Sequence, residues 1–341
     1  MSAPFNILLS SAGHRVKRVE MFRATLAELG LSGKIVAADL TPLSAAMQVA
    51  DAAEITPRCT SAEFIPALLD VCRRHAISLV VPGIDPELPA LAAAREQFAA
   101  AGVAALISSP DTVAIAADKW RTHHWLVEHG FPTVEQTTVA DALASPNAWP
   151  FPLFIKPALG SGSVGAAAVA DADELRFRTR GGDFVVQTLA AGVEYTVDVL
   201  VDRAGKCLTA IPRRRIEVRS GEVFKGVTHR RAELIDLAGR IAETLPGAYG
   251  PLNIQMFFDE PRGTIQVIEI NPRFAGGFPL AWEAGGKFPR WIIEEILGRP
   301  STATANAWKD GLVMLRHFDA VFVDAATLEK LAAQQRAAGT P

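Results

Sequence analysis

The sequence predicts an α/β domain followed by a larger α+β region. In the first third of the chain, short apolar runs alternate with helical patterns, which is typical of a parallel sheet with helices on both faces. After about residue 150, apolar runs follow one another across glycine-containing turns, which is typical of antiparallel hairpins. We expect the boundary between Ser109 and Pro132.

Composition narrows the class of protein. The chain has 341 residues, of which 49% are hydrophobic, so it is globular and not disordered. The net charge of -3 gives no basic field for nucleic acid. The first apolar run is too short for a secretory signal or a membrane span. The three cysteines are widely spaced and fit neither a disulfide framework nor a zinc site, so we expect free thiols and a cytoplasmic location.

The first domain is expected to contain four strands separated by three helices. Its strands are expected at 5–10, 34–38, 77–83 and 103–108, and its helices near 15–29, 61–75 and 86–100. Ligands of open α/β sheets lie at the carboxyl ends of strands, which here are followed by Ser10–Gly13 and Pro82–Asp85. Two helices follow, the first beginning at Ser109–Pro110 and the second ending before Gly130 and Pro132.

The second region is expected to contain several hairpins and three helices. The expected strands are 151–157, a strand after the loop at 160–165, 184–189, 194–202, 206–218, two strands around a turn at 259–263, and 312–318; the expected helices are 231–245, 287–298 and 325–337.

A lysine and a glycine-rich loop form the first candidate site. Lys156 ends a strand before a proline, where it is either a solvated strand end or a fixed cation. Residues 160–165, Gly-Ser-Gly-Ser-Val-Gly, let backbone N–H groups approach an anion closely, although such a loop also simply connects hairpins. It is not a Walker A motif, because no Gly-Lys-Ser/Thr ends it. Together, the lysine and the loop favour a lid over phosphates. Downstream, Gln187 and Glu194 form either a polar strand edge or part of the same site.

The sharpest constellation is Gln255, Glu269, Asn271 and Arg273. Positions 269, 271 and 273 alternate along one predicted strand and therefore share a face, and Gln255 lies on the strand paired with it. One carboxylate with two amide oxygens suits Mg²⁺, and an arginine beside it can hold phosphate oxygens bidentately. The alternative is an Asx-turn before Pro272 with a surface salt bridge between Glu269 and Arg273.

These elements occur in the order of a known superfamily. With Asp118–Lys119, Lys156, loop 160–165, Gln187–Leu189, Glu194, Gln255 and the run Glu269–Arg273, the chain resembles the ATP-grasp proteins, in particular the carbamoyl-phosphate-synthase-like carboxylate–amine ligases, to about residue 300. The resemblance implies an ATP-grasp fold with an N-terminal Rossmann-like domain (1–112), a small lid subdomain (113–188) and a C-terminal α+β subdomain (189–341).

The resemblance also implies roles for individual residues. Lys119 and Lys156 would contact ATP phosphates, with Lys156 also near the adenine. The loop residues Gly160, Ser161, Gly162 and Ser163 would cover the phosphates. Backbone groups of Gln187, Thr188 and Leu189 would bind adenine, and Glu194 the ribose. Glu269 would bridge two Mg²⁺ ions (Mn²⁺ being possible), completed by Gln255 and Asn271. Gln255 replaces the Asp or Glu of many relatives, as in other carbamoyl-phosphate-synthase-like members.

The implied activity is ATP-dependent joining of a small carboxylate to an amine through an acyl phosphate. Arg273, Arg215 and Lys156 would be catalytic, with Arg273 stabilising an oxyanion. In the basic stretch 213–231, Arg215 is the best candidate for binding an anionic substrate, although this stretch also fits a solvated basic hairpin. The alternatives are a bicarbonate-using carboxylating or carbamoyl-phosphate-type enzyme and an ATP-binding regulatory module without turnover. The expected partners are small molecules, with no nucleic acid or membrane and a possible homodimer.

Overall fold

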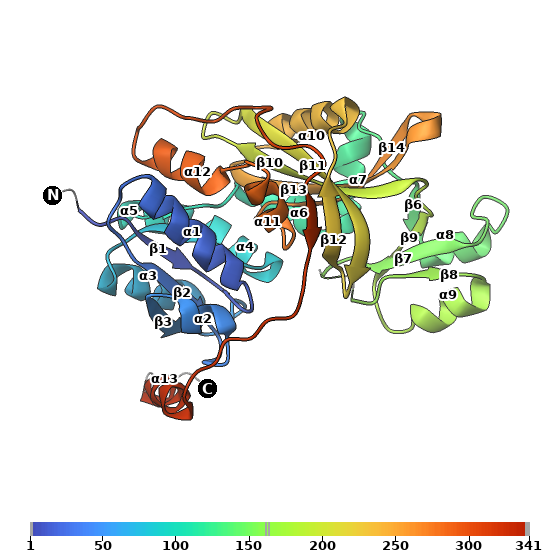
Figure 1. Cartoon of the computed structure of the whole chain (residues 1–341). Helices are drawn as coiled ribbons and strands as arrows, with labels where there is room; N and C mark the ends of the chain where they lie inside the picture. The colour runs from blue at the N-terminus through green and yellow to red at the C-terminus, as the bar shows by residue number, and fades with distance from the viewer. Residues whose placement is uncertain (1–2, 161, 163, 338–341) are drawn as a thin grey trace.

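The computed structural model describes residues 3–160, 162 and 164–337, which form three sheets (Figure 1). The first is parallel, with strand order β3-β2-β1-β4-β5, and confirms the predicted α/β domain. Its strands are β1 (Asn6–Leu9), β2 (Ile35–Asp39), β3 (Ala52–Ile55), β4 (Ile77–Val81) and β5 (Ala104–Ala105). Its helices are α1 (Val16–Glu28), α2 (Ala45–Val49), α3 (Phe64–Arg74), the 3₁₀ turn η1 (Asp85–Glu87), α4 (Leu88–Ala93) and α5 (Arg95–Ala100).

Two helices lead from this domain to the second sheet. α6 (Pro110–Ala117) begins with proline at its first position, and the Ser109 hydroxyl accepts the Thr112 N–H at 3.2 Å. The Asp118 carboxylate caps α7 (Lys119–Glu128) in the same way. The second sheet is antiparallel, with order β6-β9-β7-β8, and is called here the lid sheet. Its elements are β6 (Gln136–Thr138), α8 (Val139–Ala144), β7 (Leu153–Pro157), β8 (Ala167–Val169), α9 (Ala172–Arg178) and β9 (Phe184–Thr188).

The third and largest sheet is antiparallel, with order β14-β13-β10-β11-β12-β15. Its strands are β10 (Val193–Val201), β11 (Cys207–Arg219), β12 (Glu222–Thr228), β13 (Gly250–Asp259), β14 (Thr264–Asn271) and β15 (Val313–Leu315). The remaining elements are α10 (Ala232–Thr244), the turn η2 (Glu260–Arg262), α11 (Phe278–Glu283), α12 (Phe288–Ile296) and α13 (Ala325–Ala337). The antiparallel hairpins agree with the sequence prediction, whereas β3, β6, β12, α2, α8, α9 and α11 were not predicted.

The large sheet has one apolar and one polar face. On β10, Tyr195, Val197 and Val199 are buried in a core that also contains residues of α10. Alternation places Glu194, Thr196 and Asp198 on the opposite face. The sheet therefore presents a row of polar groups toward the middle of the molecule.

One ion pair on the polar face is fully buried. Asp198 on β10 accepts hydrogen bonds from Nε and Nη2 of Arg213 on β11, at 2.5 and 3.2 Å. Both side chains are only 1% exposed. Burial raises the pKa of Asp198, and the charge of Arg213 opposes that shift. Each charge is therefore stabilised chiefly by the other.

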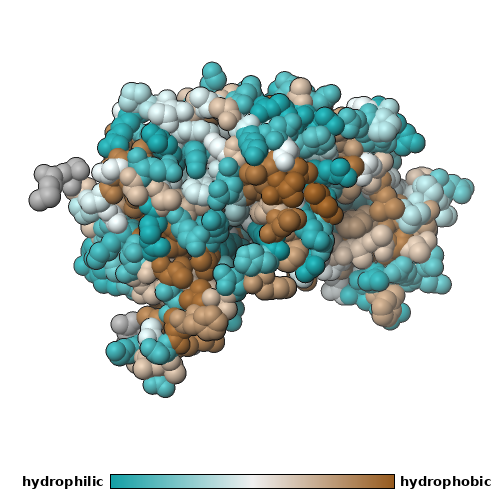
Figure 2. Space-filling view, in the orientation of Figure 1, coloured by the Kyte–Doolittle hydropathy of each residue, from teal (hydrophilic) through white to brown (hydrophobic). Residues whose placement is uncertain are grey.

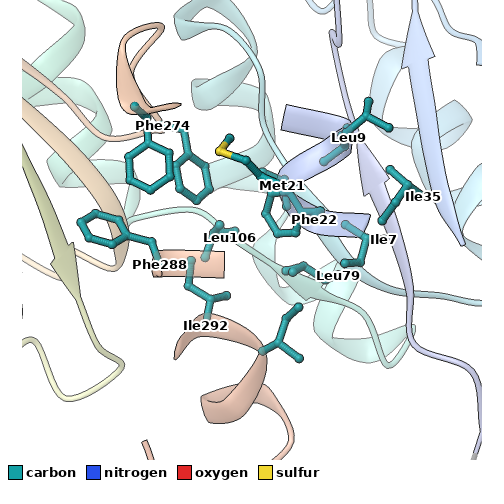
Figure 3. Close-up of a cluster of buried hydrophobic side chains, with 14 of the residues drawn as sticks. Ile7, Leu9, Met21, Phe22, Ile35, Leu79, Leu106, Phe274, Phe288 and Ile292 are labelled. Atoms are coloured by element: carbon teal, nitrogen blue, oxygen red, sulfur yellow. The ribbon is translucent and has the colours of Figure 1, made fainter. Parts of the chain in front are cut away.

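The N-terminal domain and the segment after β14 share one hydrophobic core (Figure 3). Phe274 packs edge-on against Phe22 of α1, with ring centroids 6.0 Å apart, and also contacts Phe278. α12 contributes Phe288 and Ile292 to the same core. This packing fixes the end of β14 against the carboxyl edge of the parallel sheet.

Figure 2 shows a largely hydrophilic face with hydrophobic side chains gathered beside β15 and near α2 and α13. Val313 and Leu315 of β15 and Phe318 beyond it are exposed. Within the described ranges, no helix combines the length and apolar character needed to cross a bilayer.

Replacing Asp198 with Asn is expected to destabilise the protein by roughly 3 kcal/mol, because it leaves the buried Arg213 without its counter-charge. The measurement is urea denaturation followed by circular dichroism. The matched control is Asp236→Asn, which breaks an exposed pair with Arg240 and is expected to cost about 0.5 kcal/mol or less. Equal midpoints for the two variants would contradict this account of the buried pair.

Candidate active site

A cavity of about 380 Å³ lies between the lid sheet and the polar face of the large sheet. It contains two lysines, two glutamates, an arginine and two glutamines, and its walls include aromatic and aliphatic side chains. The polar lining residues are Lys119, Lys156, Gln187, Thr188, Glu194, Arg215, Gln255 and Glu269. These come from α7, both antiparallel sheets and the segments between them, so the site forms only when the subdomains come together.

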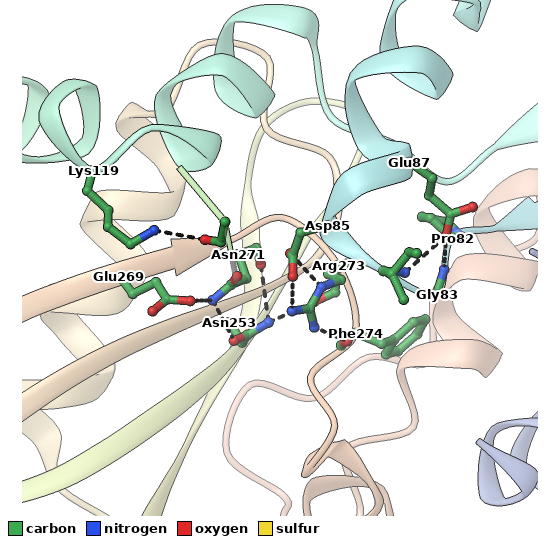
Figure 4. Close-up of polar contacts among 12 residues, drawn as sticks. Pro82, Gly83, Asp85, Glu87, Lys119, Asn253, Glu269, Asn271, Arg273 and Phe274 are labelled. Atoms are coloured by element: carbon green, nitrogen blue, oxygen red, sulfur yellow. Dashed lines mark hydrogen bonds and ion pairs between the residues drawn. The ribbon is translucent and has the colours of Figure 1, made fainter. Parts of the chain in front are cut away.

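The two lysines provide positive charge at the lid side. Lys119, at the start of α7, donates from Nζ to the carbonyl of Gly160 at 2.8 Å (Figure 4). Lys156 is the penultimate residue of β7 and is buried, with Nζ 5.6 Å from the Phe154 ring centroid. Burial lowers the pKa of both lysines, and the negative charge of Glu269 opposes the shift. Among the described residues, no carboxylate lies within 4.0 Å of the Lys156 ammonium.

An apolar slot adjoins these lysines. Phe154, Leu189, Phe257 and Ile268 line it, together with backbone of β9 and the segment after it. Gln187 points instead toward β6 and donates to Oε1 of Gln136 at 2.7 Å. The slot therefore suits a flat ring held between apolar side chains.

Arg215 connects Glu194 and Gln255 of the large sheet. Its Nε lies 3.4 Å from a carboxylate oxygen of Glu194, and its Nη1 donates to Oε1 of Gln255 at 3.1 Å. Its Nη2 donates to the carbonyl of Gly221 at 3.0 Å. Burial raises the pKa of Glu194, and the charge of Arg215 opposes that shift. Of the predicted basic stretch, Arg215 is thus the arginine that lines the cavity.

The β13–β14 hairpin confirms the expected pairing of Gln255 with Glu269, which are directly opposite in the ladder. Nδ2 of Asn271 donates to Oε1 of Glu269 at 2.9 Å, so these two side chains are on the same side of β14. Asn271 itself is buried beside Asn253. A carboxylate and an amide of neighbouring strands therefore converge at one end of the cavity.

The prediction that Arg273 shares this face is wrong. β14 ends at Asn271, and after Pro272 the chain turns, with the Arg273 N–H donating to the Asn271 carbonyl at 2.9 Å. Arg273 instead donates from Nε and Nη2 to the carboxylate of Asp85, at 2.6 and 2.5 Å (Figure 4). The alternative, a salt bridge with Glu269, is also absent from the described contacts. Strand alternation does not extend past the end of the strand.

The other predicted site residues fall into two groups. Gly160, Gly162 and Leu189 line the cavity, as does Thr188. Ser161 and Ser163 lie outside the described residues. Sequence reasoning gave no role to Asp85, although it had placed the segment Pro82–Asp85 at a strand's carboxyl end, where ligands gather.

Two family models match the chain. The model described as "PylC-like, N-terminal domain" matches residues 7–106, and "ATP-grasp in the biosynthetic pathway with Ter operon" matches residues 181–317. Residues 181–317 therefore match an ATP-grasp family. The second match contains Arg215, Gln255 and Glu269, so the ATP-grasp region includes the large-sheet side of the cavity.

The chain also has distant curated relatives. It is 27% identical over 216 residues to D-alanine–D-alanine ligase of Gluconobacter oxydans, a match that covers 54% of this chain and 70% of that one. It is 30% identical over 180 residues to formate-dependent phosphoribosylglycinamide formyltransferase of a Synechococcus species, covering 51% of this chain and 42% of that one. It also matches the N-terminal section of a carbamoyl phosphate synthase large chain of Methanopyrus kandleri, at 24% identity and covering 54% and 36%.

Solved structures share the ATP-grasp fold over most of the chain. N5-carboxyaminoimidazole ribonucleotide synthetase of Thermotoga maritima has a TM-score of 0.66 at 20% identity, covering 88% of this chain and 77% of that one. A biotin carboxylase of Campylobacter jejuni has a TM-score of 0.71 at 17% identity, covering 90% and 74%. The fold prediction is therefore confirmed.

Replacing Lys156 with Met is expected to raise the Tm of the ligand-free protein by ~2 °C, because it removes a buried ammonium with no close counter-charge. The difference in Tm between Lys156→Met and the wild type should be smaller at about pH 9.5 than at pH 7. Since the folded-state pKa of Lys156 is lowered, its burial cost is present below that pKa and is relieved as the pH rises through it.

The control is the exposed Lys206, whose replacement with Met should leave Tm nearly unchanged at both pH values. Thermal unfolding followed by calorimetry measures all three proteins. If Lys156→Met had a lower Tm than the wild type at pH 7, the ammonium would stabilise the fold. The claim that its burial destabilises the ligand-free protein would then be rejected.

Proposed function

We propose that this protein is an ATP- and Mg²⁺-dependent ligase that activates a small carboxylate as an acyl phosphate and joins it to an amine, releasing ADP and phosphate. The observation that supports this best is the convergence of Lys119 and Lys156, from the lid side, with Glu194, Gln255 and Glu269 of the large sheet in one cavity. A cavity with cations opposite oxygen ligands and an apolar slot beside them suits a nucleoside triphosphate with its metal ions.

The lining residues match the parts of ATP in order. The slot beside Phe154 and Leu189 would hold the adenine ring, with backbone of Gln187–Leu189 at its edge. Glu194 would accept hydrogen bonds from the ribose hydroxyls. Lys119 and Lys156 would neutralise phosphate oxygens, and Gly160 and Gly162 belong to the loop that would cover them.

The donor set at the end of β14 fits magnesium. Glu269 supplies the carboxylate, and amide oxygens of Gln255 and Asn271 are hard ligands that add no charge. Oε1 of Gln255 already accepts one hydrogen bond from Arg215 and keeps a second lone pair. The bound metal would neutralise charge on the phosphoryl oxygens.

The proposed chemistry has two steps. A substrate carboxylate oxygen bonds to the γ-phosphorus of ATP, the bond from that phosphorus to the ADP oxygen breaks, and ADP leaves. The amine nitrogen then bonds to the acyl carbon, phosphate leaves with the bonding electrons, and the nitrogen loses a proton to solvent. Arg215 would stabilise negative charge on the carboxylate and on the tetrahedral intermediate. Arg273, held by Asp85, would act by positioning the end of β14.

The relatives support this class of reaction and leave the substrates open. D-alanine–D-alanine ligase is by its name an enzyme that joins D-alanine to D-alanine, and of the three curated relatives described above it is the one of which the chain covers most. Biotin carboxylase and the ribonucleotide synthetase, at 17% and 20% identity, support the fold only. The two alternatives, a bicarbonate-using enzyme and a regulatory ATP-binding module, are distinguished from the ligase by the experiment below.

We also propose a homodimer. The apolar side chains exposed on and beyond the edge strand β15 would gain from burial against a second copy. Analytical ultracentrifugation is expected to give about twice the mass of 36.4 kDa, and a single species at the monomer mass would reject the proposal.

The decisive experiment measures ADP release with Mg²⁺ across paired amino acids and small acids, with hydroxylamine as a trap for the acyl phosphate. One acid is expected to give both ADP and its hydroxamate. Glu269→Gln should lower the rate at least ~100-fold, because it removes the carboxylate that would hold the metal.

The control is Glu233→Gln, which changes an exposed glutamate on α10 and should leave the rate unchanged. If ADP formed only with bicarbonate, the ligase function would be rejected in favour of a carboxylating or carbamoyl-phosphate-type enzyme. ATP binding without ADP formation for any pair would reject turnover and favour a regulatory module.

A further inference from the structure

A second polar cluster lies where the carboxyl edge of the parallel sheet meets the segment after β14 and the β11–β12 turn. We call it the edge cluster, and it consists of His14, Arg15, Arg18, Asp85, Glu87, Glu222, Arg273 and Arg316. It is not part of the lining of the cavity described above. Figure 4 shows how the two regions connect: Glu269 contacts Asn271, which contacts Asn253, which in turn donates to the carbonyl of Arg273.

The acids of the edge cluster already have partners. Asp85 is held by Arg273. Glu222 lies 2.9 Å from Nη1 of Arg316 and 3.5 Å from the ring of His14, and these two neighbours lower its pKa to about 2. Glu87 is fully buried and accepts from the N–H of Gly83 and Ile84 and from the Ser11 hydroxyl.

Most cations of the cluster are satisfied as well. Arg18, which is buried, donates to the carbonyls of Pro82 and Phe274, both at 3.3 Å. Arg316 binds Glu222 and the carbonyl of Gly276. The exception is Arg15: among the described contacts, no carboxylate lies within 4.0 Å of its guanidinium, and its side chain donates to no acceptor.

Arg15 is also placed to face a ligand. It is half-buried, at the loop that follows β1, and a Cβ at Gly13 would come within 3.2 Å of its Nη1. Gly13, with a φ of +57°, thus gives the guanidinium room over the carboxyl end of the sheet. Burial and then the nearby charge of Arg273 lower the pKa of Arg15. An anion here would neutralise a guanidinium that the protein leaves unpaired.

We propose that Arg15 binds a carboxylate that one of the two substrates keeps through the reaction, so that this substrate is an amino acid or a dicarboxylate. The inference rests on the proposed ligase function, because it assigns Arg15 to one of that reaction's substrates. A guanidinium binds a carboxylate bidentately, and Glu222 and Asp85 nearby disfavour a doubly charged phosphate. The retained carboxylate belongs either to the acid that is activated or to the amine that attacks it.

The test measures binding, independent of turnover. Isothermal titration calorimetry, with Mg²⁺ and ADP present, compares glycine, L-alanine, L-lysine, L-glutamate and succinate with their carboxamides. At least one acid is expected to bind the wild type about tenfold more tightly than its carboxamide. In Arg15→Ala the ratio of the carboxamide Kd to the acid Kd should fall to about one. Arg15→Lys should give a ratio between those of Arg15→Ala and the wild type.

The matched control is Arg23→Ala, which removes another arginine of α1, paired with Asp51 on the surface, and should keep the wild-type ratio. The proposal is overturned if the ratio is the same in Arg15→Ala as in the wild type, or if no member binds the wild type at millimolar concentration. Hydroxamate formed from the bound acid identifies it as the activated substrate, and ADP release without its hydroxamate identifies it as the amine. Arg15-dependent binding without any ADP release would reject the ligase function and leave the binding site standing.

Discussion

The register of the β13–β14 hairpin is the constraint on which the rest of the site depends. It places Gln255 opposite Glu269, and β10 on the other side of β13 brings Thr196 opposite Gln255. A slip of one residue would turn these side chains to the apolar face and bury Glu269 among the residues that pack on α10. The tight turn that ends in Gly263, whose φ is +65°, helps to fix this register.

A β-bulge adjusts the same hairpin. The ladder passes from Gln255–Glu269 directly to Met256–Val267, so Ile268 has no partner opposite. As a result, Ile268 and Glu269 both line the cavity, while Val267 and Ile270 both enter the core beneath the sheet. The bulge thus supplies an apolar wall and a carboxylate to the cavity from adjacent positions.

These details show how far sequence could predict the site. The pairing of Gln255 with Glu269 followed from a short turn between two alternating strands, which are local signals. The position of Arg273 did not, because its partner Asp85 lies 188 residues away and is brought near only by the shared core of Phe22 and Phe274. β3, β6 and β12 were missed because they are short, half-polar or interrupted by glycine, so their pairing depends on neighbours and not on their own pattern.

The cavity joins two parts with separate cores. The lid sheet packs around its own small cluster, which includes Leu153, Ile155 and Val186, whereas β14 packs with α10 in a separate core through Val267 and Ile270. Lys156 therefore belongs to one packing unit and Glu269 to the other, and across the cavity the charge of Glu269 opposes the lowering of the Lys156 pKa. A ligand that carries both phosphate and metal would pair its phosphate with Lys156 and its metal with Glu269 at the same time. The buried charge of Lys156, which has no carboxylate within 4.0 Å among the described residues, would thus favour an anionic ligand in this cavity.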